Sequence, residues 1–212
     1  MAADLDAEPE LTIGLCVAAH ARVLVTVEGL TDDVARSPSR LPGWTVAHTL
    51  THIARNAEGH AVRLEGALRG VDLPRYPGGG RQRDADIAAG SVRPAGDLVA
   101  DLAQVQGRLE AVWEQSVAAR WPHPEFTGSD GWPTTSSPSR RLREVEMHHV
   151  DLGLGYETTD WPVEYVEWEL PWVLATASDR LPDLVSRQSL LAWLTGRGGP
   201  PTCTELGPWR AR

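Results

Sequence analysis

Two pairs of potential metal ligands stand four residues apart in this sequence. His48 precedes His52 by four positions, and Glu144 precedes His148 by the same interval. Residues four apart lie on one face of an α-helix, close enough to bind one ion together. The two pairs therefore predict a divalent-metal site between two helices, with ordinary solvated or core positions as the alternative. Further potential ligands near the second pair are Glu146, His149 and Asp151.

A zinc ion with three protein ligands keeps an open coordination position, which is typical of catalytic zinc sites. Such a position can hold water or a thiol, and the metal lowers the pKa of the thiol so that the thiolate forms at neutral pH. The two cysteines of the chain, Cys16 and Cys203, stand in no motif that ties them to a histidine. We therefore expect a reactive thiol to arrive as a cosubstrate.

Several other chemistries have no support in the sequence. It contains no G-x-S-x-G nucleophile motif, and the glycine-rich segment PGGGR lacks the G-K-[ST] ending of a phosphate-binding loop. The net charge is -9 without basic blocks, which excludes nucleic acid as a principal partner. The apolar runs are shorter than the roughly 20 residues of a membrane span, and the acidic N-terminus lacks the hydrophobic region of a secretory signal. With only two cysteines, a cytoplasmic location is expected.

Helical periodicity predicts the elements that must position these residues. Four long amphipathic helices are expected. The first starts at Pro9 and ends before residue 38, and the second follows an N-cap at Thr45 and ends near residue 68. The third runs from near residue 95 to near residue 117, and the fourth from near residue 139 to near residue 154. Residues 70–94 are predicted to form a long loop. Four such helices can bury their apolar stripes together only as a bundle, so the fold class is mainly α.

The C-terminal part of the chain differs in composition from the rest. Five of the nine tryptophans lie between residues 161 and 209, where six prolines divide the chain into short pieces. We therefore predict a four-helix bundle over residues 1–156 and a small Trp/Pro-rich cap domain over residues 157–212. Helices are expected near 162–178 and 187–195, with strands as an open alternative.

The predicted metal site lies to the side of the bundle core. On a helical wheel, His48 and His52 lie opposite the apolar stripe of their helix, and Glu144 and His148 lie on a flank of theirs. Such a site needs a further cover. The available covers are the 70–94 loop and the Trp-rich C-terminal segment.

Four segments together resemble the mycothiol-dependent maleylpyruvate isomerase family of the DinB-like superfamily: LPGWTVAHTLTHIARNAEGH, YPGGGRQRDADIAAG, RLREVEMHHVDLGLGY and LLAWLTGRGGPP. The resemblance implies a DinB-like four-helix bundle that holds a divalent metal, normally zinc. The ligands that it implies are His52, Glu144 and His148. His48 then takes a helix N-terminal or supporting position, and Asp151 either orients a neighbouring ligand or is a solvated charge.

The resemblance also implies a reaction, the cis-to-trans isomerisation of maleylpyruvate to fumarylpyruvate with mycothiol as the catalytic thiol. Arg197 matches a position with a substrate-contacting, catalytic role, and a guanidinium suits the carboxylates of such an anionic substrate. Arg81 and Arg83 are candidates for contacting the thiol cofactor or the substrate, with a solvated loop as the alternative. Two other functions stay open: a mycothiol S-transferase that conjugates an electrophile, and a non-catalytic DinB-like metal-binding protein.

Overall fold

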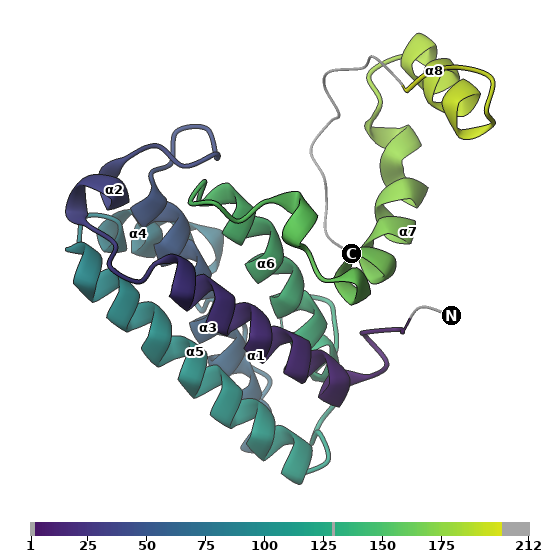
Figure 1. Ribbon diagram of the computed structural model, residues 1–212. Coiled ribbons are helices and arrows are strands. Elements are labelled where there is room, and N and C mark those ends of the chain that lie inside the picture. The colour runs from purple at the N-terminus through teal and green to yellow at the C-terminus, as the bar shows by residue number, and fades with distance from the viewer. Residues whose placement is uncertain (1–2, 129, 201–212) are drawn as a thin grey trace. The chain divides into compact units, whose positions relative to one another are not determined.

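The computed structural model describes residues 3–128 and 130–200 (Figure 1). The chain divides into two compact units. One spans Asp4–Trp161, and the other consists mainly of the residues from Pro162 onward. Each unit is described by itself.

Four long helices form a bundle in the first unit: α1 (Pro9–Thr26), α3 (Val46–Leu68), α5 (Ala95–Ala118) and α6 (Ser137–Asp151). α1 packs against α5 and α6, and α3 packs against the same two helices, so each helix has two neighbours (Figure 1). The side chains that fill the bundle are almost completely buried, among them Leu50, Ile53, Leu102, Leu109, Trp113 and Leu142. The predicted four-helix bundle is confirmed.

Local chemistry explains where the site-bearing helices begin and end. Thr45 is the N-cap of α3, as the sequence predicts, and its Oγ1 accepts a hydrogen bond from the backbone N–H of His48. The ring of His48 accepts in return from the backbone N–H of Thr45 at 3.3 Å, which completes a capping box. α6 begins at Ser137, two residues before the predicted start, and ends at Asp151 shortly before Gly153, whose φ of 69° suits glycine.

The prediction of a long loop over residues 70–94 is wrong, because α4 (Gly79–Gly90) lies within it. The glycine-rich start of this helix hides it from a periodicity argument. Tertiary packing on α3 stabilises it instead: Ile87 is buried, and a Cβ atom at Gly90 would lie 2.4 Å from Cγ2 of Thr51. The described part of this unit also contains the short elements α2 (Asp32–Arg36), η1 (Thr134–Ser136) and η2 (Thr158–Asp160).

α1 is the one described helix that is long and apolar enough to cross a membrane by length and hydropathy. Its polar residues have partners within the bundle, however. His20 contacts Glu110 of α5 at 2.7 Å, and Arg22 contacts Glu146 of α6 at 2.5 Å. These contacts identify α1 as a bundle helix.

The second unit contains α7 (Val163–Arg180) and α8 (Leu184–Leu194). Asp183 caps α8, since its Oδ1 accepts from the backbone N–H of Ser186 at 2.7 Å. No strand occurs among residues 162–200, so the strand alternative is not realised in this described segment.

Candidate metal centre

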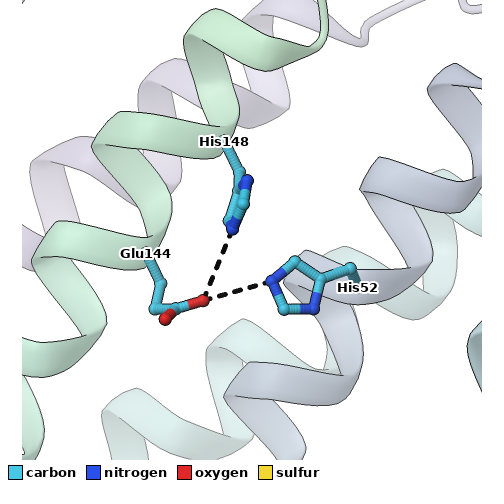
Figure 2. Close-up of side chains that lie close together, drawn as sticks. All are labelled: His52, Glu144 and His148. Atoms are coloured by element: carbon cyan, nitrogen blue, oxygen red, sulfur yellow. Dashed lines mark hydrogen bonds and ion pairs between the residues drawn. The ribbon is translucent and has the colours of Figure 1, made fainter. Parts of the chain in front are cut away.

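His52 of α3 and Glu144 and His148 of α6 point toward one another (Figure 2). One potential ligand atom from each residue lies within 4.8 Å of the other two. His52 Nε2 is 3.1 Å from Glu144 Oε2, and His148 Nε2 is 3.6 Å from the same oxygen. Among residues 3–128 and 130–200, this is the one cluster of three or more such donors.

Helix geometry and one buried arginine explain the convergence. The four-residue spacing puts Glu144 and His148 on one face of α6, and this face turns toward α3. Arg141, one turn before Glu144, is completely buried and its Nη1 donates to the backbone oxygen of Ile53 and to Asn56 Oδ1 at 2.8 and 2.9 Å. Arg141 therefore fixes α6 on α3 beside the cluster.

The charges of the cluster stabilise one another. Desolvation by itself raises the pKa of Glu144, but hydrogen bonds from His148 and His52 outweigh it and hold this pKa well below its usual value. Desolvation lowers the pKa of His148, whereas hydrogen bonds to Asp151 and Glu144 outweigh it and raise the pKa to about 9. Burial lowers the pKa of His52 in spite of Glu144.

Two imidazoles and one carboxylate are donors that zinc and similar divalent metals accept. His148 is arranged for this task, because Asp151 Oδ2 lies 2.8 Å from its Nδ1. A carboxylate that accepts a hydrogen bond from Nδ1 fixes the ring orientation and keeps the lone pair of Nε2 available for a metal. The donor set therefore fits a divalent ion, and Asp151 is placed to orient a ligand.

The cover of this cluster comes from α4 and from the turn before α3. Arg83 of α4 places Nη2 3.2 Å from His52 Nδ1, and the indole of Trp44 meets the His52 ring edge-on at 5.8 Å between centroids. Beside them lies a cavity of about 360 Å³, lined by Gly43, Trp44, His48, Asp84, Ile87 and Ala88. His52 is consequently only 4 % exposed, although a helical wheel places it away from the core.

The other predicted site residues make different contacts. His48 contacts Thr45 Oγ1 at 2.7 Å and Ser91 Oγ at 3.1 Å, so it closes the start of α3. Arg81 is exposed on α4 and makes no hydrogen bond or ion pair with another described residue. Arg197 follows α8 in the second unit, where it is exposed and its Nη1 donates to the backbone oxygen of Thr195 at 2.7 Å.

Glu146 and His149 face away from the cluster. Glu146 accepts hydrogen bonds from Arg22 and from the Tyr156 hydroxyl, both at 2.5 Å. The His149 ring stacks on Tyr156 at 3.7 Å between centroids, and its Nε2 lies 2.7 Å from Thr26 Oγ1. These two alternative ligands therefore belong to a separate buried network.

Sequence reasoning missed Trp44 and Arg141. Trp44 lies in the LPGWT turn, where a tryptophan carries no ligand chemistry of its own. Arg141 stands beside the core residue Leu142 in a segment with several arginines, and nothing in its spacing marks it as buried.

Comparisons with known proteins identify the family and the fold. A family model for the mycothiol maleylpyruvate isomerase N-terminal domain matches residues 16–153. Two crystal structures of the mycothiol-dependent maleylpyruvate isomerase, one of a histidine-to-alanine mutant, share the fold with a TM-score of 0.73 and identities of 22 % and 23 %. Each comparison covers 89 % of this chain and 75 % of the other. No curated protein matches in sequence. Because the family model spans more than half of the chain, the protein belongs to the mycothiol maleylpyruvate isomerase family.

Proposed function

We propose that this protein isomerises maleylpyruvate to fumarylpyruvate, with a divalent metal, zinc by preference, at His52, Glu144 and His148 and with mycothiol as thiol cosubstrate. The observation that carries the proposal is the two-imidazole, one-carboxylate cluster in a chain of this family. Its ligands number three, which leaves room for a thiol.

A bound metal would supply a Lewis acid that keeps the sulfur of the cosubstrate as a thiolate. In the proposed reaction this thiolate adds to the cis double bond, a C–S bond forms, and the electron pair moves into the adjoining carbonyl. Rotation about the resulting single bond and expulsion of the same thiolate produce the trans alkene, so no thiol is consumed.

The residues of the chain have separate tasks in this proposal. His52, Glu144 and His148 hold the ion, and Asp151 orients the ring of His148. Arg197, Arg83 and Arg81 are proposed contacts for the carboxylates of the substrate or for the thiol, since a guanidinium binds carboxylates in a bidentate manner.

The described cysteine supports an external thiol. Cys16 is completely buried in α1, and desolvation raises the pKa of its thiol far above the usual value. It therefore stays protonated and out of reach of a substrate. Cys203 lies outside the described residues. A reducing compartment keeps such thiols free, and we place the reaction in the cytoplasm.

The direct test incubates the purified zinc-loaded protein with mycothiol and maleylpyruvate and follows fumarylpyruvate by chromatography. We expect product only when both the thiol and the metal are present, with the thiol recovered unchanged. A stable thioether would identify an S-transferase instead, and no reaction of either kind would favour a non-catalytic metal-binding protein.

The same assay tests Arg197. Replacing Arg197 with Ala should lower kcat/KM by roughly tenfold or more, because a charged hydrogen bond to the substrate is lost, while the zinc content stays unchanged. Arg187→Ala, an exposed arginine of the same unit, is the matched control. Equal kinetics of the two variants would remove Arg197 from the proposed machinery.

A further inference from the structure

The two histidines of the cluster differ in what faces their second ring nitrogen. Nδ1 of His148 faces a carboxylate oxygen, Asp151 Oδ2, at 2.8 Å. Nδ1 of His52 faces the guanidinium of Arg83, whose Nη2 lies 3.2 Å away. A carboxylate only accepts hydrogen bonds, whereas a guanidinium only donates them. The Nδ1 atoms of the two rings therefore face groups of opposite hydrogen-bonding character, an acceptor at His148 and a donor at His52.

The contact with Arg83 determines where His52 carries its proton. Since Arg83 can only donate, Nδ1 of His52 must accept. The proton of the neutral ring then lies on Nε2, which donates to Glu144 Oε2 at 3.1 Å. In this arrangement the ring nitrogen that points at the cluster has no lone pair to offer to a metal (Figure 2).

His52 can ligate through Nε2 only as the tautomer that carries its proton on Nδ1. In that tautomer two N–H donors, Nδ1 of His52 and Nη2 of Arg83, would point at each other. The guanidinium would also remain close to the positive charge of the metal ion, and like charges at such a range repel each other. Arg83 must therefore leave Nδ1 of His52 when His52 becomes a ligand.

Arg83 is held by more exposed contacts than Arg75 and Arg141, two other arginines near the cluster. Its side chain is 32 % exposed, and its second contact is an ion pair of 2.9 Å with Asp84, whose side chain is 70 % exposed. Such an exposed ion pair contributes little to stability. In contrast, Arg75 pairs at 2.9 Å with Asp130, which is only 10 % exposed, and Arg141 is completely buried.

We propose that Arg83 is a positioning residue that couples occupancy of the metal site to binding of an anion. While Nη2 of Arg83 faces Nδ1 of His52, Arg83 competes with metal binding. When His52 becomes a ligand, the released guanidinium is available to a carboxylate beside the site. This inference rests on the proposed function, and it names a dicarboxylate as the class of ligand that Arg83 receives.

The first experiment measures the tautomer of His52 in the metal-free full-length protein by ¹⁵N–¹H correlation NMR, with His52→Gln to assign the signals. We expect the proton on Nε2 in the wild type and a shift toward the Nδ1-protonated form in Arg83→Met. A wild-type ring with its proton on Nδ1 would overturn the proposal without any measurement of activity.

The second experiment measures Zn²⁺ affinity by competition with a chromophoric chelator. Arg83→Met should bind Zn²⁺ roughly tenfold more tightly than the wild type, the scale on which partners of metal ligands act. Arg83→Lys, which keeps a cation that only donates, should stay within about threefold of the wild type. Arg69→Met, an exposed arginine just after α3, is the matched control and should leave Zn²⁺ affinity unchanged.

The third experiment adds maleate as a dicarboxylate probe. Maleate should raise the Zn²⁺ affinity of the wild type by about fivefold or more, and Zn²⁺ should raise maleate affinity by the same factor, because coupling is reciprocal. Arg83→Met should lose this coupling, whereas Arg69→Met should keep it.

The outcomes separate this inference from the proposed function. Equal Zn²⁺ affinity of Arg83→Met and wild type, or equal coupling to maleate, overturns the inference alone. Intact Zn²⁺ and maleate coupling without formation of fumarylpyruvate overturns the proposed function alone. A wild-type protein that binds no Zn²⁺ overturns both.

Discussion

Two faces of α6 each carry a glutamate and a histidine, but the two pairs make different contacts. One face presents Glu144 and His148, and the other presents Glu146 and His149. The first pair meets His52 of α3 in a cluster of potential metal ligands. The second pair lies in the contact with α1 and the segment that follows α6.

What differs is the set of partners that each face meets. Glu146 is paired with a cation, Arg22, and also accepts from a tyrosine hydroxyl, so its charge is balanced and its oxygens are occupied. Among the described residues, the hydrogen-bond and ion-pair partners of Glu144 are two imidazoles, those of His52 and His148. A carboxylate beside imidazoles keeps lone pairs for a metal, whereas a carboxylate that already binds a guanidinium is a structural ion pair. The partner helices therefore decide which contacts each pair makes.

The largest expected difference between the faces concerns metal content. His148→Ala should reduce bound zinc from roughly one equivalent to nearly none, because a ligand is lost, and the bundle should stay folded. His149→Ala should keep its zinc. Plasma emission spectroscopy on dialysed protein measures the metal, and circular dichroism checks the fold. Equal zinc content in both variants would contradict the assignment of the ligands, and His52→Ala should behave like His148→Ala.

A smaller difference is expected in the stability of the metal-free protein. Glu146→Ala should lower the free energy of unfolding by about 2 kcal/mol, since it removes the carboxylate partner of Arg22 and leaves the Tyr156 hydroxyl with the backbone oxygen of Asp160 alone, at 3.0 Å. Glu146→Gln, which keeps an acceptor for Tyr156, should cost less. Glu144→Ala should affect zinc binding far more than urea denaturation. A Glu146→Ala protein as stable as the wild type would remove the distinction between the two faces.

The smallest expected effect concerns the pH dependence of stability, to which His148 and His149 contribute with opposite sign. Burial, with help from Arg22, lowers the pKa of His149 from 6.5 to about 4, so its contribution to stability is present above pH 6.5 and is lost as the pH falls through 4. The pKa of His148 is raised to about 9, so its contribution is complete below pH 6.5 and is lost as the pH rises through 9.

Urea denaturation of the metal-free protein between pH 4 and 10 measures both limbs. His149→Gln should flatten the acid limb and His148→Gln the alkaline limb. Finding the two limbs exchanged between the variants would contradict the protonation states that the two environments impose.

Much of the bundle follows from local sequence. The apolar stripes predict α3 and α5 to within a residue or two, and Thr45 is the N-cap that its side chain indicates. α4 escapes such reasoning because its start is rich in glycine and its stability depends on packing against α3. Arg83 therefore lies on a helix that packs on α3 and not in a solvated loop. The boundary of the predicted domains and the role of Arg197 stay predictions.

The sequence by itself determined which residues share a helical face, because the period of the α-helix depends only on local backbone geometry. It therefore determined that Glu144 and His148 lie on the same face of one helix. The residue spacing left His48 and His52 as alternatives, and the family resemblance favoured His52. Only the tertiary structure showed that His52 meets Glu144 and His148, that His48 does not, and that Arg83 faces the ring of His52. These outcomes depend on which helices pack side by side and on the charges that they bring to a buried ring. Such contacts join residues about 30 to 90 positions apart, beyond the reach of any local pattern.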